Sequence, residues 1–141
     1  MNTRVILIVT LFVFGASSCK KQTADSQETL TSKSWKRALN DLNPSTNPQG
    51  PVLYYAVRNC EKDDTFTFGS SGKLVIDRSN DKCDPNESQT ENQSYTLNRQ
   101  TKALVINGTT FTLAEESNTQ IKYYAVVPMP GGFQYLVFLL Q

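Results

Sequence analysis

Short runs of alternating apolar and polar residues, separated by turn-forming residues, most constrain the fold of this chain. The run 65–68 (TFTF) alternates cleanly and ends at 69–72 (GSSG). Asn107-Gly108 precedes the run 109–113, and Asn-Gly is a strong signal for a type I′ β-hairpin. No long amphipathic helical pattern accompanies these runs. Because side chains alternate between the two faces of a strand, the pattern predicts an antiparallel sheet or barrel.

The predicted strands continue to the C-terminus and number about eight or nine. A chain of 141 residues is long enough for one domain. Closing a sheet into a barrel removes its unpaired edges, so we predict an all-β fold: a single antiparallel up-and-down β-barrel. The runs lie at 35–40, 52–57, 65–68, 74–76, 95–97, 104–106, 109–113, 121–127 and 133–140.

The N-terminus has the organisation of a secretory signal peptide. Arg4 precedes an almost wholly apolar stretch at 5–14, and small residues follow at 15–18. Ten helical residues reach only about 15 Å, half of a ~30 Å hydrocarbon core. We therefore predict a cleaved signal over 1–18 rather than a permanent membrane span.

The sequence Ala16-Ser17-Ser18-Cys19 resembles the end of a bacterial lipoprotein signal. In that family the cysteine is acylated and becomes the new N-terminus, so the resemblance implies a lipid anchor at Cys19. The alternative is ordinary cleavage nearby, which leaves a free cysteine. Residues 19–29 then form a polar tether, and the domain occupies 30–141.

With Cys19 lipidated, Cys60 and Cys83 remain. Outside the cytoplasm two cysteines in a small domain favour a structural disulfide. A redox pair usually has close C-x-x-C spacing, and a zinc site needs four ligands. We therefore predict a structural Cys60–Cys83 disulfide. A redox pair and a metal site are the alternatives.

Composition argues against enzymatic chemistry. The chain has no histidine and a net charge of +1, so it lacks the commonest general base and metal ligand and has no basic stripe for nucleic acid. We predict no enzymatic activity, no cofactor, no metal and no nucleic-acid partner. Asp63-Asp64 is interpreted as a turn with an Asx hydrogen bond, because adjacent strand residues point to opposite faces.

A calcium site is the other metal hypothesis that the sequence raises. Its acidic and hydroxyl residues begin at Asp77, but an EF-hand loop needs Gly at its sixth position and Glu at its twelfth. Lys82 and Ser88 stand there instead, which argues against calcium. The candidate ligands are Asp77, Ser79, Asp81 and Asp84.

Two segments resemble the lipocalin-like domains of small lipoproteins from Bacteroidota: 30–36 (LTSKSWK) and 60–68 (CEKDDTFTF), the latter followed by Cys83. The resemblance covers roughly 30–141. It implies that Trp35 lies on the first strand and plugs one end of a barrel. It also implies that 60–68 lies where the second strand hairpins into the third and that the two cysteines pair. It implies no assigned activity.

The leading functional hypothesis is a binding module that holds a small hydrophobic ligand inside the barrel, since an eight-stranded barrel can enclose one small ligand. The same side chains could instead simply fill the core. The residues predicted for this pocket or core are Trp35, Phe66, Phe68, Tyr95, Leu97, Ile106, Phe111 and Tyr123.

The alternative hypothesis is a structural or interaction protein that contacts an envelope partner through the polar loops 41–51 and 78–92. Under either hypothesis we expect a monomer anchored in the cell envelope. The residues after Cys19 favour the outer membrane facing the periplasm, with surface exposure left open.

Overall fold

The computed structural model describes residues 29–141, which form nine β-strands and two short 3₁₀ helices. The predictions for the signal peptide, for Cys19 and for most of the tether lie outside these residues. Residues 29–141 contain no candidate membrane-spanning helix. The elements are β1 (Trp35–Lys36), η1 (Pro44–Thr46), β2 (Val52–Tyr54), η2 (Asn59–Glu61), β3 (Thr65–Phe68), β4 (Lys73–Asp77), β5 (Thr90–Asn98), β6 (Ala103–Ile106), β7 (Thr109–Glu116), β8 (Ile121–Met129) and β9 (Gly132–Leu140).

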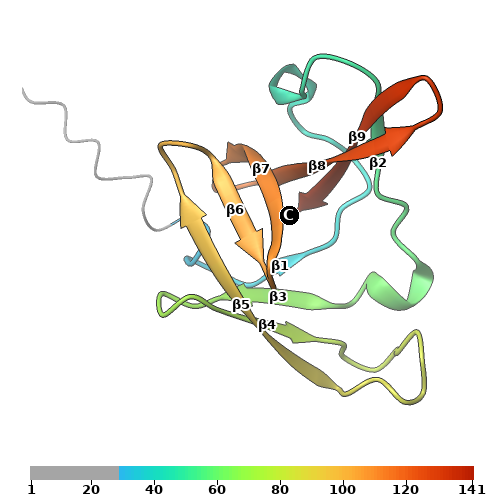
Figure 1. Ribbon diagram of the computed structural model, residues 1–141. Helices are drawn as coiled ribbons and strands as arrows, with labels where there is room; N and C mark the ends of the chain where they lie inside the picture. The colour runs from blue at the N-terminus through green and yellow to red at the C-terminus, as the bar shows by residue number, and fades with distance from the viewer. Residues whose placement is uncertain (1–28) are drawn as a thin grey trace, which may run out of the picture.

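The all-β prediction is confirmed, and the strands form one curled sheet in the order β1-β3-β4-β5-β6-β7-β8-β9-β2. Figure 1 shows this sheet as a half-barrel. Strand β5 connects the β1-β3-β4 part of the sheet to the part formed by β6 to β9 and β2, since its residues 90–94 pair with β4 and its residues 95–98 pair with β6. From β3 to β9 each strand is antiparallel to the next in the sequence, as an up-and-down arrangement requires.

Strand β2 departs from the predicted up-and-down order. It pairs parallel with β9, where Val52 lies opposite Tyr135, and β1 pairs with β3 instead. The implied hairpin from the second strand into the third is therefore wrong. Parallel neighbours need a long connection, and strands β3 to β8 supply it between β2 and β9. The loop 37–51 carries the chain from β1 at one end of the strand order to β2 at the other.

Two predicted strands are shorter than expected. The run 52–57 contributes only Val52–Tyr54, and the run 35–40 contributes Trp35–Lys36 with one further bridge from Arg37 to Leu140. Leu39 is 63% exposed and lies outside the sheet, so the alternation breaks down after Arg37.

The segment 36–38 contacts both ends of the strand series. Lys36 pairs with Thr65 of β3 and also exchanges two backbone hydrogen bonds of 2.9 Å with Gln141. The Ala38 amide donates to the Leu139 carbonyl at 3.1 Å. The first strand therefore lies between β3 and the end of β9.

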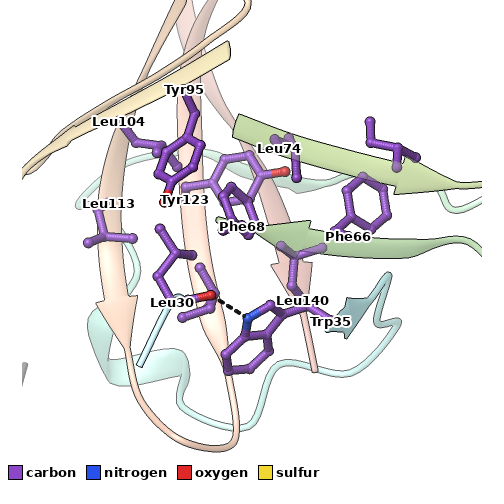
Figure 2. Packing of buried hydrophobic residues seen from close by; sticks show 12 residues of the cluster. Leu30, Trp35, Phe66, Phe68, Leu74, Tyr95, Leu104, Leu113, Tyr123 and Leu140 are labelled. Atoms are coloured by element: carbon purple, nitrogen blue, oxygen red, sulfur yellow. Dashed lines mark hydrogen bonds between the residues drawn. The ribbon is translucent and has the colours of Figure 1, made fainter. Parts of the chain in front are cut away.

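The core fills the concave side of the sheet around Trp35 (Figure 2). Trp35 is fully buried, and its indole Nε1 donates to the Leu30 carbonyl at 2.9 Å. Alternate residues of the strands supply the remaining side chains, as the period of two requires. The buried cluster comprises Leu30, Trp35, Phe66, Phe68, Leu74, Ile76, Tyr95, Leu104, Leu113, Ile121, Tyr123 and Leu140.

The predicted hairpin turn at Asn107-Gly108 is confirmed. Asn107 and Gly108 have φ values of +46° and +80°, and they place Ile106 opposite Thr109. Positive φ at both central residues defines the type I′ turn, which asparagine and glycine tolerate best. The stretch 69–72 likewise connects β3 to β4.

Candidate ligand-binding site

A cavity of about 270 Å³ lies on the concave face of the sheet, beside the buried core. Its lining combines aromatic and aliphatic side chains with several polar groups and one cation, and a small-molecule site likewise places a few polar groups among apolar ones. It is lined by Arg37, Phe66, Leu74, Ile76, Gln93, Ile106, Asn107, Thr109, Phe111, Tyr123 and Phe138.

Three aromatic rings form one wall of the cavity. Phe111 meets Tyr123 and Phe138 edge to face at centroid distances of 5.2 and 5.6 Å, and Tyr123 stacks on Phe138 at 5.1 Å. The register places these rings together, because Tyr123 of β8 lies directly opposite Phe138 of β9. Phe66 and Ile76, also paired across strands, complete the apolar lining from β3 and β4.

Arg37 brings a positive charge to this aromatic wall. Its guanidinium carbon lies 4.5 Å from the Phe66 ring centroid, 5.1 Å from that of Tyr55 and 5.4 Å from that of Phe138. Its Nη1 donates to the Tyr123 hydroxyl at 3.0 Å. Cations are attracted to ring faces within about 6 Å, so the rings fix the position of this side chain.

The polar lining on the other side comes from β5 and from the β6–β7 turn. Gln93 Nε2 donates to Glu91 Oε1 at 2.6 Å, and Glu91 also pairs with Arg78. The hydrogen bond from Arg78, with a smaller effect from Gln93, lowers the pKa of Glu91 against the opposing effect of burial. Glu91 is therefore charged and already neutralised by Arg78.

The eight predicted pocket or core residues divide into two groups. Phe66, Ile106, Phe111 and Tyr123 line the cavity. The others lie outside it: Trp35 and Phe68 are buried in the core. Tyr95, also in the core, and Leu97, which packs against it, line a second, larger cavity.

Sequence reasoning did not select Arg37 or Phe138 as site residues. The sequence did contain a signal for Arg37: it lies two residues after Trp35 in the run 35–40, so strand alternation places both side chains on the same face. A charged residue on an inward-facing position is the feature that could have identified it.

A second cavity, of about 420 Å³, lies between the β3–β4 turn and the end of β5. It is lined in part by Ser70, Thr96 and Arg99. Arg99 already pairs with Glu116, at 3.0 Å from Nε to Oε2 and 2.9 Å from Nη2 to Oε1. This larger cavity has fewer aromatic groups, and its cation has a partner, so the smaller cavity is the better candidate site.

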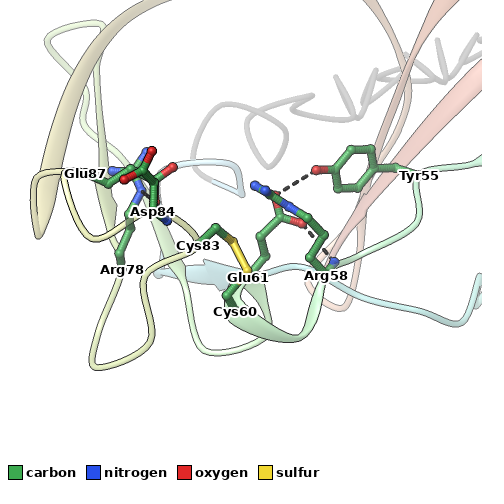
Figure 3. Close-up of a disulfide and its surroundings, with 8 residues drawn as sticks. All are labelled: Tyr55, Arg58, Cys60, Glu61, Arg78, Cys83, Asp84 and Glu87. Atoms are coloured by element: carbon green, nitrogen blue, oxygen red, sulfur yellow. Dashed lines mark hydrogen bonds and ion pairs between the residues drawn. A yellow bond between two sulfur atoms is a disulfide. The ribbon is translucent and has the colours of Figure 1, made fainter.

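The predicted disulfide is present, and it joins η2 to the loop between β4 and β5 (Figure 3). The Cα atoms of Cys60 and Cys83 are 5.2 Å apart, within the usual range. Ion pairs lie beside it: Arg58 Nη2 is 2.9 Å from Glu61 Oε1, and Arg78 Nε is 3.5 Å from Glu87 Oε2. The bridge is embedded in a charged surface rather than in the apolar site.

Asp63 and Asp64 differ from the predicted Asx turn. Asp63 Oδ2 accepts from the Asn80 amide at 3.4 Å, which is a contact between loops. Asp64 is buried, and within residues 29–141 neither its Oδ1 nor that of Asp63 has a hydrogen-bond partner. Burial raises the pKa of Asp64, Arg78 opposes that rise, and the charge of Asp63 adds to it.

The loop 41–51 is held against the sheet by a buried lysine that the sequence analysis did not single out. Lys122 lies between the core residues Ile121 and Tyr123, so its side chain points to the opposite face. Its Nζ lies 2.8 Å from Asp41 Oδ2 and donates to the Asn43 carbonyl at 2.6 Å. A buried charge requires such partners, and they position the beginning of the loop.

The candidate calcium ligands make local hydrogen bonds instead. Asp77 Oδ1 accepts from the Ser79 amide at 3.0 Å, and Asp84 Oδ1 accepts from the Asn86 amide at 2.8 Å. In the part of the chain that the structure describes, no group of three or more Cys, Asp or Glu residues is placed to hold a metal ion.

Comparison with protein-family models, with curated proteins and with solved structures finds no match to this chain.

Proposed function

We propose that this protein is a membrane-anchored, lipocalin-like carrier that binds a small hydrophobic ligand on the concave face of its sheet. The observation that supports this function is the aromatic cavity of about 270 Å³. Its volume lies just below the ~300–1,000 Å³ of typical ligand sites, so a small ligand suits it. The proposal assigns the protein no enzymatic activity.

We also propose that the sheet forms a lipocalin-like barrel. The hydrogen bonds from Lys36 and Ala38 to the end of β9 support this, because they connect the β3 side of the sheet to its last antiparallel strand. The complete burial of Trp35 on the first strand suits the role of a plug. A barrel with one plugged end can hold a ligand at the other.

The proposed location is the cell envelope, with Cys19 lipidated and the domain facing the periplasm from the outer membrane. The support is the sequence of residues 5–21, where an apolar stretch and small residues precede Cys19 and two lysines. In this proposal the protein binds its ligand without a partner protein.

The test is native mass spectrometry of the Cys19→Ser chain purified gently from a periplasm. We expect an added mass that organic extraction removes. Thr109→Trp should abolish it, because Thr109 lines the cavity and an indole there would occupy the opening. Thr110→Trp is the matched control, since the next strand residue points to the other face. Retention of the ligand by Thr109→Trp would contradict the assignment of the site.

A second candidate function is contact with an envelope protein. Leu39 and Leu42 favour it, because they are 63% and 57% exposed at the start of the loop between β1 and β2. Photo-cross-linking from position 42 in cells should then capture one partner, and Leu42→Ser in combination with Leu39→Ser should release it. Capture of no protein would remove this candidate.

A further inference from the structure

Arg37 is a cation at the cavity, and it has no ionic partner in the part of the chain that the structure describes. Within residues 29–141 the ion pairs involve Arg58, Arg78, Arg99 and Lys122, and none involves Arg37. The Tyr123 hydroxyl is the hydrogen-bond acceptor that the structure gives to its guanidinium. A guanidinium has five N–H donors, so most of them are open to a ligand.

Two acidic groups, each linked to a residue that lines the cavity or contacts Arg37, already have other partners. Glu91 is held by Arg78 and Gln93. Glu61 accepts from Arg58 and from the Tyr55 hydroxyl, at 2.9 and 2.7 Å. Neither carboxylate is within ion-pair distance of Arg37, although Tyr55 contacts both Glu61 and Arg37.

The aromatic contacts of Arg37 leave its hydrogen-bonding edge available. Cation–π attraction acts through the ring faces of Tyr55, Phe66 and Phe138. The N–H groups lie in the guanidinium plane, where a carboxylate can accept two of them side by side. The Tyr123 hydroxyl, which accepts from Arg37, keeps its own O–H to donate to the same anion.

We propose that the ligand is a small apolar carboxylate whose charged group binds Arg37 and Tyr123, while its hydrocarbon part lies against Phe66, Phe111 and Phe138. This inference depends on the proposed binding function and names its ligand class. The cavity volume of about 270 Å³ is comparable to nine water molecules at ~30 Å³ each. A medium-length chain fits that space, so octanoate is a suitable probe.

The experiment compares octanoate with octan-1-ol, which has the same chain and no charge, by amide chemical-shift titration of residues 29–141 within the full Cys19→Ser chain at pH 7. We expect octanoate to bind about 10- to 100-fold more tightly, the range expected for hydrogen bonds to a charged group. Arg37→Gln should abolish this preference, because it should weaken octanoate binding far more than octan-1-ol binding.

The control is Lys73→Gln, which removes one positive charge from an exposed position of β4 and should keep the preference. Arg37→Lys retains the charge without the planar fork and should restore part of it. Amide spectra of each variant establish that the fold is intact.

The outcomes separate the two proposals. Equal binding of octanoate and octan-1-ol to the natural sequence would overturn the carboxylate class and leave the carrier function standing. Loss of both ligands in a folded Arg37→Gln variant would assign Arg37 a structural role and also overturn this inference. Binding of neither probe to the natural sequence would reject the carrier function itself.

Discussion

Asp41 is the residue whose ionisation is most clearly coupled to the fold. Its burial disfavours the charged form, but hydrogen bonds from Lys122, from the Asn43 amide, from Tyr54 and from Gln120 outweigh that effect. Together they lower the pKa of Asp41 from 3.8 to about 2. The native state therefore holds Asp41 ionised at pH values where the unfolded chain protonates it.

This difference predicts a stability loss in acid. Between pH 4 and pH 2 the unfolded state binds the extra proton, so the contribution of Asp41 is present above pH ~4 and is lost as the pH falls toward 2. We expect the unfolding free energy of the natural sequence, measured in urea, to fall by about 2 kcal/mol more over this interval than that of Asp41→Asn. Asp81→Asn, at an exposed position, should behave like the natural sequence. Parallel pH profiles for all three would contradict the prediction.

At the scale of the elements, the disulfide stabilises the long loop between β4 and β5. It joins η2, just before β3, to the loop that separates β4 from β5. Arg78, at the start of the same loop, forms ion pairs with Glu87 in the loop and with Glu91 of β5. The covalent bond and the ion pairs thus stabilise one substructure.

We expect the double variant Cys60→Ser/Cys83→Ser to lower the unfolding free energy by about 3 kcal/mol, the entropy of closing a loop of 23 residues. Urea denaturation measures this loss. Thiol titration of the unfolded natural chain should find neither of these two cysteines free. Two free thiols, or a denaturation curve that the double variant does not shift, would refute the stabilising role.

At the scale of the whole molecule, Trp35 connects the first strand to the rest of the core. It lies opposite Phe66 across β1 and β3, and its indole hydrogen bond holds Leu30 against the same cluster. The Lys33 ammonium lies 4.3 Å above its ring. Removal of this side chain would leave a cavity where the N-terminal segment meets the sheet.

We therefore expect Trp35→Ala to lower the unfolding free energy by about 3–5 kcal/mol. Trp35→Phe should cost less, about 1–3 kcal/mol, because it keeps the ring but leaves the Leu30 carbonyl without its donor. Leu39→Ala is the exposed control and should stay within about 0.5 kcal/mol of the natural sequence. Thermal or urea denaturation distinguishes the three, and an unchanged midpoint for Trp35→Ala would reject its role in the core.

The candidate site could be predicted from the sequence only in part. Alternation placed Phe66, Ile106, Phe111 and Tyr123 on inward positions, and the structure brings all four to one cavity. Their neighbours at the cavity come from distant segments, since Arg37 and Phe138 are about a hundred residues apart in the chain yet lie in cation–π contact. No local pattern encodes such a contact.

The sequence by itself determined the local structure: the period of two sets the strands, and Asn107-Gly108 sets a type I′ turn because these residues tolerate positive φ. Those preferences act over a few residues. Only the tertiary structure decided that β2 pairs parallel with β9, that Lys122 is buried against the loop 41–51, and that Arg37 reaches the aromatic wall. Each depends on which distant surfaces the folded chain buries together, and burial is a property of the whole molecule.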